Sequence, residues 1–371
     1  MRVLMAPDKF KGTLSASEVA AALAAGWRRA RPGDEILELP VADGGDGTLS
    51  TLVAALGGEV RRAKVAGPLG DPVEAEYGLV ETSGGTEAII EMARASGLGL
   101  VSESRRDPLG ATTRGTGELI LEAVEAGATK VLVCIGGSAT NDAGAGMAQA
   151  LGVRLLDEAG AELPPGAAAL DRLAAIDLGG LDPRVAKASV LVACDVDNPL
   201  TGPRGASAVY GPQKGASPED VAFLDRCLGR FSSVAGRDLG LDLRDIEGAG
   251  AAGGMGAGLI AFLGARLRPG FDLVADVLDL PRRIAEADLV VTGEGRFDRQ
   301  SLHGKAPAGV LHLAGETGTR AVVVAGQVEE GIEVPAERVV DLSARFGLEA
   351  AMDRPRALLE DVAAELAEGL A

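Results

Sequence analysis

The feature that most constrains this chain is an abrupt change of composition inside residues 130–152, which read KVLVCIGGSATNDAGAGMAQALG. Residues 131–135 are all apolar, without the alternation of a half-exposed strand, and this is typical of a parallel strand covered on both faces. Gly136 and Gly137 follow at once, and a run of small residues typical of a helix comes after them. The order of strand, glycine loop and helix indicates an α/β fold.

The loop after this strand suits an anion. Helix N-termini carry unpaired N–H donors and partial positive charge, so a phosphate or carboxylate can dock there without a lysine. The groups expected to contact the anion are Gly136, Gly137, Ser138, Thr140 and Asn141. Two points stay open. The loop also fits an ordinary turn capped by Asn141, and Asp142 must either point away from an anion or hold a metal ion.

Composition excludes several classes of function. The chain has 371 residues, 47% of them hydrophobic, which is enough for two well-filled domains. Its net charge of -18 argues against nucleic acid or an anionic membrane surface as a partner, so local cations must hold any anionic substrate. No apolar run approaches the roughly 20 residues of a membrane span, and the first residues lack signal-peptide features, so a cytoplasmic location is expected.

The two ends of the chain share one pattern of apolar residues, and the middle of the chain has another. Strands are predicted at residues 1–6, 35–41, 288–292, 320–325 and 338–342, whereas residues 60–93 alternate in short runs typical of antiparallel strands. We therefore predict a doubly wound, mainly parallel sheet domain, flavodoxin-like or Rossmann-like, from residues 1–65 and 265–371. A mixed α/β domain of residues 66–264 is inserted into it.

Charged residues follow several predicted strands at their carboxyl ends, where open α/β sheets place ligand groups. Asp8, Lys9 and Lys11 follow the first strand, although the two lysines are also compatible with plain surface charge. Asp43 follows the second strand, among glycines that let a carboxylate approach a metal ion or a substrate hydroxyl closely.

A second carboxylate group follows the predicted strand at residues 190–193. Asp195 and Asp197 point the same way if the chain is extended, so they could share a divalent metal, or one could act as a base. A third dense polar segment follows residues 288–292. A glycine-rich and alanine-rich stretch, residues 248–258, matches no dinucleotide-binding fingerprint, and it suggests a hinge or close helix packing.

Five motifs in register carry a resemblance to a known family. They are MAPDKFKGTLSA, PVADGGDGTL, IGGSATNDAGAGMAQALG, ACDVDNPLTGPRGASAVYGPQKGA and TGEGRFDRQSLHGKAP. Together they resemble the bacterial glycerate kinase family, the type with an APDSFKGSLSA-like N-terminal motif, over essentially the whole chain. The resemblance implies phosphorylation of D-glycerate by ATP with Mg²⁺, on two α/β domains around a cleft. Lys9 departs from the family's usual Ser, and Asp46 from its usual Glu.

Roles follow from these positions and from the resemblance. Asp195 is the first candidate for the group that accepts the hydroxyl proton or holds the metal, with Asp43 and Asp298 as rivals, and Lys11 joins the catalytic set. ATP phosphates are assigned to Gly136, Gly137, Ser138, Thr140, Asn141 and Lys214. Substrate binding is assigned to Asp8, Lys9, Arg204, Glu294, Arg296, Gln300, Ser301 and Lys305. Mg²⁺ is assigned to Asp195 and Asp197.

The product expected by analogy with the sugar-diacid pathways in which the family occurs is 2-phosphoglycerate rather than 3-phosphoglycerate. Two other readings stay open: a nucleotide-cofactor oxidoreductase of a 2-hydroxy acid, which would lack its usual fingerprint, and a non-enzymatic small-molecule sensor. The expected partners are D-glycerate and ATP, with no nucleic acid and no membrane, and a homodimer stays open.

Overall fold

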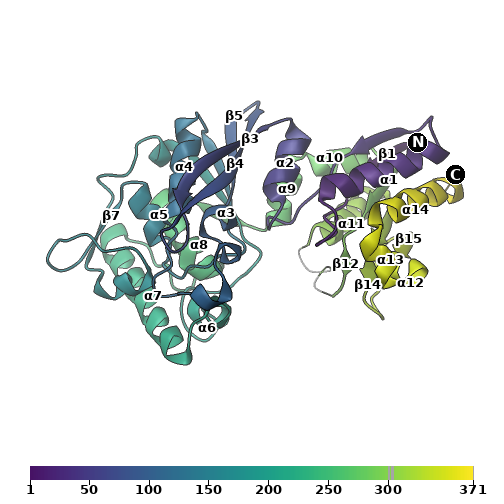
Figure 1. The fold of residues 1–371 in the computed structure, drawn as a ribbon. Coiled ribbons are helices and arrows are strands. Elements are labelled where there is room, and N and C mark those ends of the chain that lie inside the picture. The colour runs from purple at the N-terminus through teal and green to yellow at the C-terminus, as the bar shows by residue number, and fades with distance from the viewer. Residues whose placement is uncertain (300, 302–304, 371) are drawn as a thin grey trace. The chain divides into compact units, whose positions relative to one another are not determined.

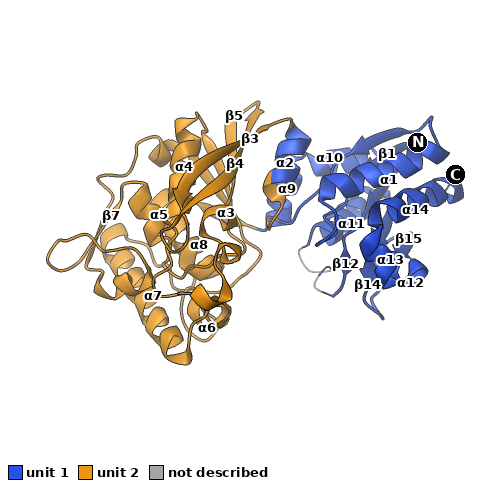
Figure 2. Ribbon diagram, viewed as in Figure 1, with its two compact units in different colours: residues 1–43, 50–56, 269–371 blue, residues 44–49, 57–268 orange. Residues whose placement is uncertain are grey.

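The computed structural model describes residues 1–299, 301 and 305–370 (Figure 1). The chain divides into two compact units, coloured separately in Figure 2. Unit 1 comprises Met1–Asp43, Ser50–Leu56 and Pro269–Ala371, and unit 2 comprises Gly44–Leu49 and Gly57–Arg268. Both units combine parallel strands with helices, so the predicted α/β class is confirmed. The predicted ranges 1–65, 66–264 and 265–371 differ from these units, because residues 59–66 and 266–268 are strands of the unit 2 sheet.

Unit 1 is built on a five-stranded sheet in which every pairing is parallel. Its strand order is β2 (Glu35–Glu38), β1 (Arg2–Met5), β11 (Leu289–Thr292), β13 (Arg320–Ala325) and β15 (Arg338–Asp341). Numbered along the chain within this sheet, the order is 2-1-3-4-5, as in flavodoxin-like doubly wound folds. The order reverses between β1 and β11, and such sheets bind ligands at the carboxyl ends of the strands beside the reversal.

Helices cover both faces of this sheet. Val3, Val291 and Val322 pack against α1 (Ala16–Ala30) and α14 (Pro355–Gly369), which lie side by side in Figure 1. The strand residues that alternate with them are equally buried, and α11 (Ala306–Thr317) contacts β11 and β13. Further elements of the unit are α2 (Thr48–Leu56, residues 50–56 only), α9 (Gly270–Val277), α10 (Leu280–Ala285), α12 (Leu342–Phe346), α13 (Leu348–Asp353) and the parallel pair β12 (Arg296–Phe297) and β14 (Gln327–Val328).

Unit 2 contains a mixed sheet, as predicted for the inserted domain. Its strand order is β3 (Glu59–Ala66), β4 (Pro72–Thr82), β5 (Gly85–Glu91), β6 (Lys130–Cys134), β9 (Ser189–Ala193) and β10 (Arg266–Arg268). The first three strands pair antiparallel and the last four pair parallel. The apolar run of residues 131–135 is the central strand β6 with the first residue of its loop, and it is buried along its length.

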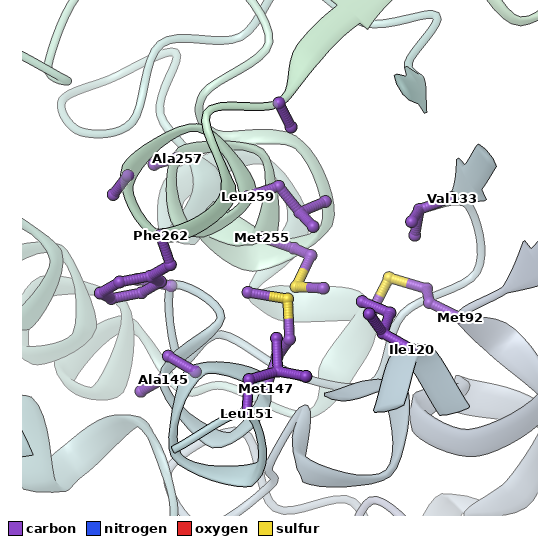
Figure 3. Close-up of a cluster of buried hydrophobic side chains, with 14 of the residues drawn as sticks. Met92, Ile120, Val133, Ala145, Met147, Leu151, Met255, Ala257, Leu259 and Phe262 are labelled. Atoms are coloured by element: carbon purple, nitrogen blue, oxygen red, sulfur yellow. The ribbon is translucent and has the colours of Figure 1, made fainter. Parts of the chain in front are cut away.

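The glycine-rich and alanine-rich stretch begins α8 (Ala251–Leu263), and the structure shows close packing there. A Cβ at Gly253 would lie 2.0 Å from the carbonyl oxygen of Thr140, and one at Gly258 would lie 2.2 Å from that of Ala143. Only glycine allows this approach. Figure 3 shows the thioethers of Met147 and Met255 next to each other, in the core between α8 and α5 (Ala145–Ala150).

The other elements of unit 2 surround this core. They are α3 (Ala93–Ser96), α4 (Arg114–Glu125), α6 (Ala206–Tyr210), α7 (Pro218–Leu239) and the antiparallel pair β7 (Arg154–Leu156) and β8 (Ala175–Asp177). Within the described part of the chain, no helix has the length and apolar character that crossing a lipid bilayer requires.

Candidate functional site

A pocket of about 390 Å³ lies in unit 2 at the carboxyl ends of β6 and β9. These strands pair in parallel with Cys134 opposite Ala193, so the loops that follow them start side by side. Five predicted site residues line the pocket, namely Gly136, Gly137, Ser138, Asp195 and Lys214. The sequence had not assigned the other lining residues to a site, and they are Gly44, Gly45, Leu98, Ile135, Ala193, Cys194, Val196, Tyr210, Gln213, Ala251 and Ala252.

Two glycine loops meet at this pocket. Gly137 has a φ of 73°, in the left-handed region that side chains rarely adopt. A Cβ at Gly136 would have its nearest neighbour, the Cα of Gly45, 3.9 Å away, so glycine at position 136 leaves open space rather than avoiding a clash. Backbone N–H groups of such loops can approach a phosphate closely.

Two hydrogen bonds within unit 2 hold the loop of Gly44 and Gly45. The hydroxyl of Thr48 donates to the carbonyl of Gly45 at 2.7 Å, and the N–H of Leu49 donates to the carboxylate of Glu91 at 2.9 Å. Glu91 is buried and is paired in turn with the guanidinium of Arg94 at 3.0 Å. The boundary between the units falls between Asp43, which belongs to unit 1, and Gly44, which belongs to unit 2.

The helix after the Gly136 loop does not begin where the sequence predicted. It starts at Ala145, and the carboxylate of Asp142 accepts hydrogen bonds from the N–H groups of Gly144 and Gly146 at 3.3 and 3.1 Å. The N–H of Ala145 donates to the backbone carbonyl of Asp142, and that of Met147 donates to the hydroxyl of Thr113. The first N–H groups of α5 are therefore used within the protein and are not available to an anion, contrary to the expectation. Thr140 and Asn141 are fully buried and are not part of the pocket lining.

Asp142 does not line the pocket, so its carboxylate points away from the proposed anion, one of the two options that the sequence left open. It also accepts hydrogen bonds from the N–H and the hydroxyl of Thr113, both at 2.9 Å. It is fully buried, and this burial raises the pKa of its carboxyl, although the four hydrogen bonds oppose the shift. Asp142 thus ties the start of α5 to the start of α4.

Lys214 supplies the positive charge of the pocket. It ends a 3₁₀ turn over Pro212–Lys214, and its side chain is only 1% exposed. Its ammonium donates to the hydroxyl of Ser138 at 2.8 Å and to the carbonyl of Thr140 at 2.6 Å. Burial lowers the pKa of Lys214 from 10.5 to about 7, and the carboxylate of Asp142 acts in the opposite direction. Two of the three ammonium N–H bonds are used, so one can serve an anion in the pocket.

Asp195 and Asp197, the pair predicted to hold Mg²⁺, differ in their surroundings. Asp195 is exposed and lines the pocket, whereas Asp197 forms an ion pair with Arg204 at 3.0 Å, in which both side chains are 70% exposed. Neither Asp197 nor Arg204 lines the pocket. Across residues 1–299, 301 and 305–370, no three His, Cys, Asp or Glu side chains lie close enough together to hold a metal ion.

Tyr210 is a pocket residue that the sequence did not indicate. Its hydroxyl donates to the side-chain carbonyl of Asn198 at 2.6 Å, which fixes the ring at the rim of the pocket. Burial raises the pKa of this hydroxyl, so it stays a donor at neutral pH. The turn signals in residues 210–215 could have placed Tyr210 near Lys214, but no pattern in the sequence connects it with Asn198.

Unit 1 carries a second group of predicted site residues, at the point where its strand order reverses. Asp8 follows β1, Asp43 follows β2 and Glu294 follows β11, so three adjacent strands each lead to a carboxylate. Asp8 and Glu294 are buried, at 4% and 6% exposure. Burial is the main cause that raises the pKa of Asp8 from 3.8 to about 7 and also raises that of Glu294.

The other predicted site residues of unit 1 differ in burial and in their contacts. Lys305 lies 3.7 Å from Glu294. Asp298 and the buried Ser301 form a tight turn, in which the N–H of Asp298 donates to the Ser301 hydroxyl at 2.9 Å. Arg296 is 67% exposed, Lys11 is exposed and Lys9 is half-buried. Gln300 lies outside the described residues.

Comparison with known proteins gives one consistent answer. The model of the glycerate kinase family matches residues 3–371. A protein of Bacillus subtilis named glycerate kinase and one of Escherichia coli named glycerate 2-kinase are each 49% identical over 92% of this chain and 89% of their own. A crystal structure from Salmonella typhimurium LT2, provisionally named glycerate kinase 2, superposes with a TM-score of 0.90 at 45% identity. That match covers 100% of this chain and 98% of the other.

With these relatives, the α/β fold is that of an enzyme of the kinase class. The chain belongs to the glycerate kinase family. The comparisons give no support to a nucleotide-cofactor oxidoreductase or to a small-molecule sensor.

Proposed function

We propose that this protein transfers the γ-phosphoryl group of ATP to D-glycerate. The observation that carries the proposal is the unit 2 pocket, where two glycine loops and the buried Lys214 line one space in a chain of the glycerate kinase family. No cysteine or histidine nucleophile is needed for this chemistry, because positioning and charge neutralisation supply most of the rate acceleration.

In this proposal the pocket binds the phosphates of ATP. Gly136, Gly137 and Ser138 offer backbone N–H groups and a hydroxyl, and Lys214 offers a buried cation. A phosphate beside Lys214 would raise the pKa of its ammonium above about 7, because a nearby anion favours the charged form. Binding would therefore favour the charged ammonium of Lys214 and pair it with the phosphate. Thr140 helps to position Lys214, because its carbonyl accepts a hydrogen bond from the Lys214 ammonium. The side-chain amide of Asn141 donates to the hydroxyl of Ser207, which fixes the loop beside Thr140.

The Mg²⁺ expected with ATP has a candidate ligand in Asp195. Mg²⁺ sites in kinases use one or two carboxylates together with substrate phosphates and waters, so a single carboxylate at the pocket fits this ion. The ion would neutralise charge on the transferring phosphoryl group. Asp197, the second predicted ligand, does not line the pocket and is paired with Arg204, so Asp195 is the ligand we favour.

The residues of unit 1 remain the candidates for binding D-glycerate. Lys9, Lys11, Arg296 and Lys305 supply cations for the substrate carboxylate. Asp8, Asp43, Glu294, Asp298 and Ser301 supply hydrogen-bond partners for its hydroxyls. Arg204, which the sequence also assigned to substrate binding, belongs to unit 2, is exposed and forms an ion pair with Asp197.

The 2-hydroxyl is the proposed acceptor, so the product would be 2-phosphoglycerate. The support is the E. coli relative named glycerate 2-kinase, which is 49% identical to this chain. Phosphorus NMR of the product formed from D-glycerate distinguishes the two phosphate esters directly. We expect the signal of the 2-phosphate, coupled to one carbon-bound proton. A 3-phosphate signal alone, coupled to two protons, would refute this choice of hydroxyl and leave the kinase assignment intact.

A further inference from the structure

Three adjacent strands of unit 1 lead to the carboxylates of Asp43, Asp8 and Glu294. Backbone hydrogen bonds fix the segments that carry them. The N–H of Asp8 donates to the carbonyl of Gly293 at 2.8 Å, and the N–H of Val41 donates to the carbonyl of Pro7 at 2.9 Å. The carboxylates therefore lie beside the reversal of strand order, at the sheet end where doubly wound folds bind ligands.

Glu294 leaves one oxygen of this group without a partner. Its Oε1 atom is buried and has no hydrogen-bond partner among the described residues, although the side chain is only 6% exposed. The nearest cation, the ammonium of Lys305, lies 3.7 Å from the other oxygen. A buried oxygen without a hydrogen bond is costly, and a substrate hydroxyl is a donor that would satisfy it.

The surroundings of Asp8 favour its protonated form. Burial is the largest cause that raises its pKa to about 7, and the charges of Asp43 and Glu294 act in the same direction. The ammonium of Lys9 and the N–H of Lys9, which donates to Asp8 Oδ1 at 2.6 Å, act against them. The pKa of Glu294 is in turn raised by burial and by the charges of Asp298 and Asp43, and lowered by a hydrogen bond with the Ser301 hydroxyl and by the ammonium of Lys305. A group whose pKa lies near the operating pH is well suited to accept and release a proton.

We propose that Asp8 is the general base that accepts the hydroxyl proton of D-glycerate during phosphoryl transfer. The glycerate oxygen forms its bond to the γ-phosphorus of ATP as its proton moves to the Asp8 carboxylate. The bond from that phosphorus to the β,γ-bridging oxygen breaks, and its electron pair leaves with ADP. The proton then passes from Asp8 to water. This inference rests on the proposed function, and it moves Asp8 from substrate binding to catalysis.

The assignment makes kcat/KM depend on pH in a defined way. Asp8 accepts a proton only when ionised, so kcat/KM for D-glycerate should rise with pH through an apparent pKa of about 7. Replacing Lys9 by Gln removes a cation that lowers the pKa of Asp8, so the rising limb should move to higher pH. Asp43→Asn removes an anion that raises this pKa, so the limb should move to lower pH. Each shift should be about half a pH unit or more.

The direct test is Asp8→Asn, which keeps the side-chain shape and loses the basicity. We expect kcat to fall by about 10² to 10⁴, with KM for D-glycerate close to that of the parent. A residue that only bound glycerate would instead raise KM. The matched control is Asp361→Asn, which removes a carboxylate that is 61% exposed and paired with Arg29 on the surface of unit 1, and should leave the pH profile in place.

The outcomes separate this assignment from the proposed function. If the parent shows no glycerate-dependent ADP release, both are wrong. If the parent turns over but Asp8→Asn keeps kcat within about threefold, only the role of Asp8 is wrong. The pH profiles give a second test, which holds even if Asp8→Asn fails to fold. If the rising limb of kcat/KM stays in place in both Lys9→Gln and Asp43→Asn, or moves in the same direction in both, the role of Asp8 is wrong.

Discussion

Two buried side chains, one in each unit, have pKa values near neutral pH, so their charged and neutral forms are similarly populated there. Burial lowers the pKa of Lys214 to about 7 and raises that of Asp8 to about 7. Both shifts disfavour the charged form, because each group has been taken out of water without a full set of opposite charges. In a kinase such groups can gain charge when an anion arrives, or change charge as a proton moves.

Asp195 can be tested as the Mg²⁺ ligand by Asp195→Asn, measured as a rate against Mg²⁺ concentration. Losing a ligand charge should raise the Mg²⁺ concentration for half-maximal rate by about tenfold or more. The paired site predicted from the sequence requires Asp197→Asn to have the same effect. The structure predicts a much smaller one, because Asp197 is exposed and paired with Arg204. Equal effects of the two variants would show that both carboxylates bind Mg²⁺. If Asp195→Asn had no effect, Mg²⁺ would not bind at this pocket.

At the scale of elements, the strand β6 and its glycine loop were predictable and the helix after them was not. An unbroken apolar run followed by two glycines predicts a buried strand and a turn from local sequence alone. The start of α5 depends on distant contacts, since the N–H of Ala143 donates to the carbonyl of Gly253 at 3.1 Å. Ala143 and Gly144 adopt left-handed φ values there, which a sequence of small residues permits but does not require.

The same loop carries a prediction about nucleotide binding. Gly136→Val should weaken binding of a non-hydrolysable ATP analogue by about tenfold or more, because the added side chain would occupy the space proposed for the phosphates. Position 136 has no left-handed φ, and the nearest atom to an added Cβ is 3.9 Å away, so the fold should tolerate the change. Gly137→Val is a poorer test, since its φ of 73° adds strain.

Calorimetric titration of each variant measures the affinity, and Gly229→Val in α7 is the matched control. An added Cβ at Gly229 meets nothing within 4 Å, and this glycine does not line the pocket. A folded Gly136→Val variant that binds the analogue as tightly as the Gly229→Val variant would exclude this loop from the nucleotide site.

At the scale of the whole molecule, the fold class and the inserted mixed sheet could be read from the sequence, while the membership of the sites could not. The change from alternating to continuous apolar runs separates β3, β4 and β5 from the parallel strands in the sequence itself. The pocket, however, is assembled from segments near residues 45, 137, 195, 214 and 251, and no local pattern connects them. The burial of Asp8 and Glu294 likewise depends on packing that their short polar motifs do not encode.

The most direct test of the central claim is ADP release from ATP by the purified protein, measured with and without D-glycerate and again after chelation of Mg²⁺. We predict that ADP forms only with D-glycerate, in amounts equal to the phosphoglycerate produced, and that a chelator abolishes the reaction until Mg²⁺ is restored. Equal ADP release without D-glycerate, or no ADP release with it, would contradict the account.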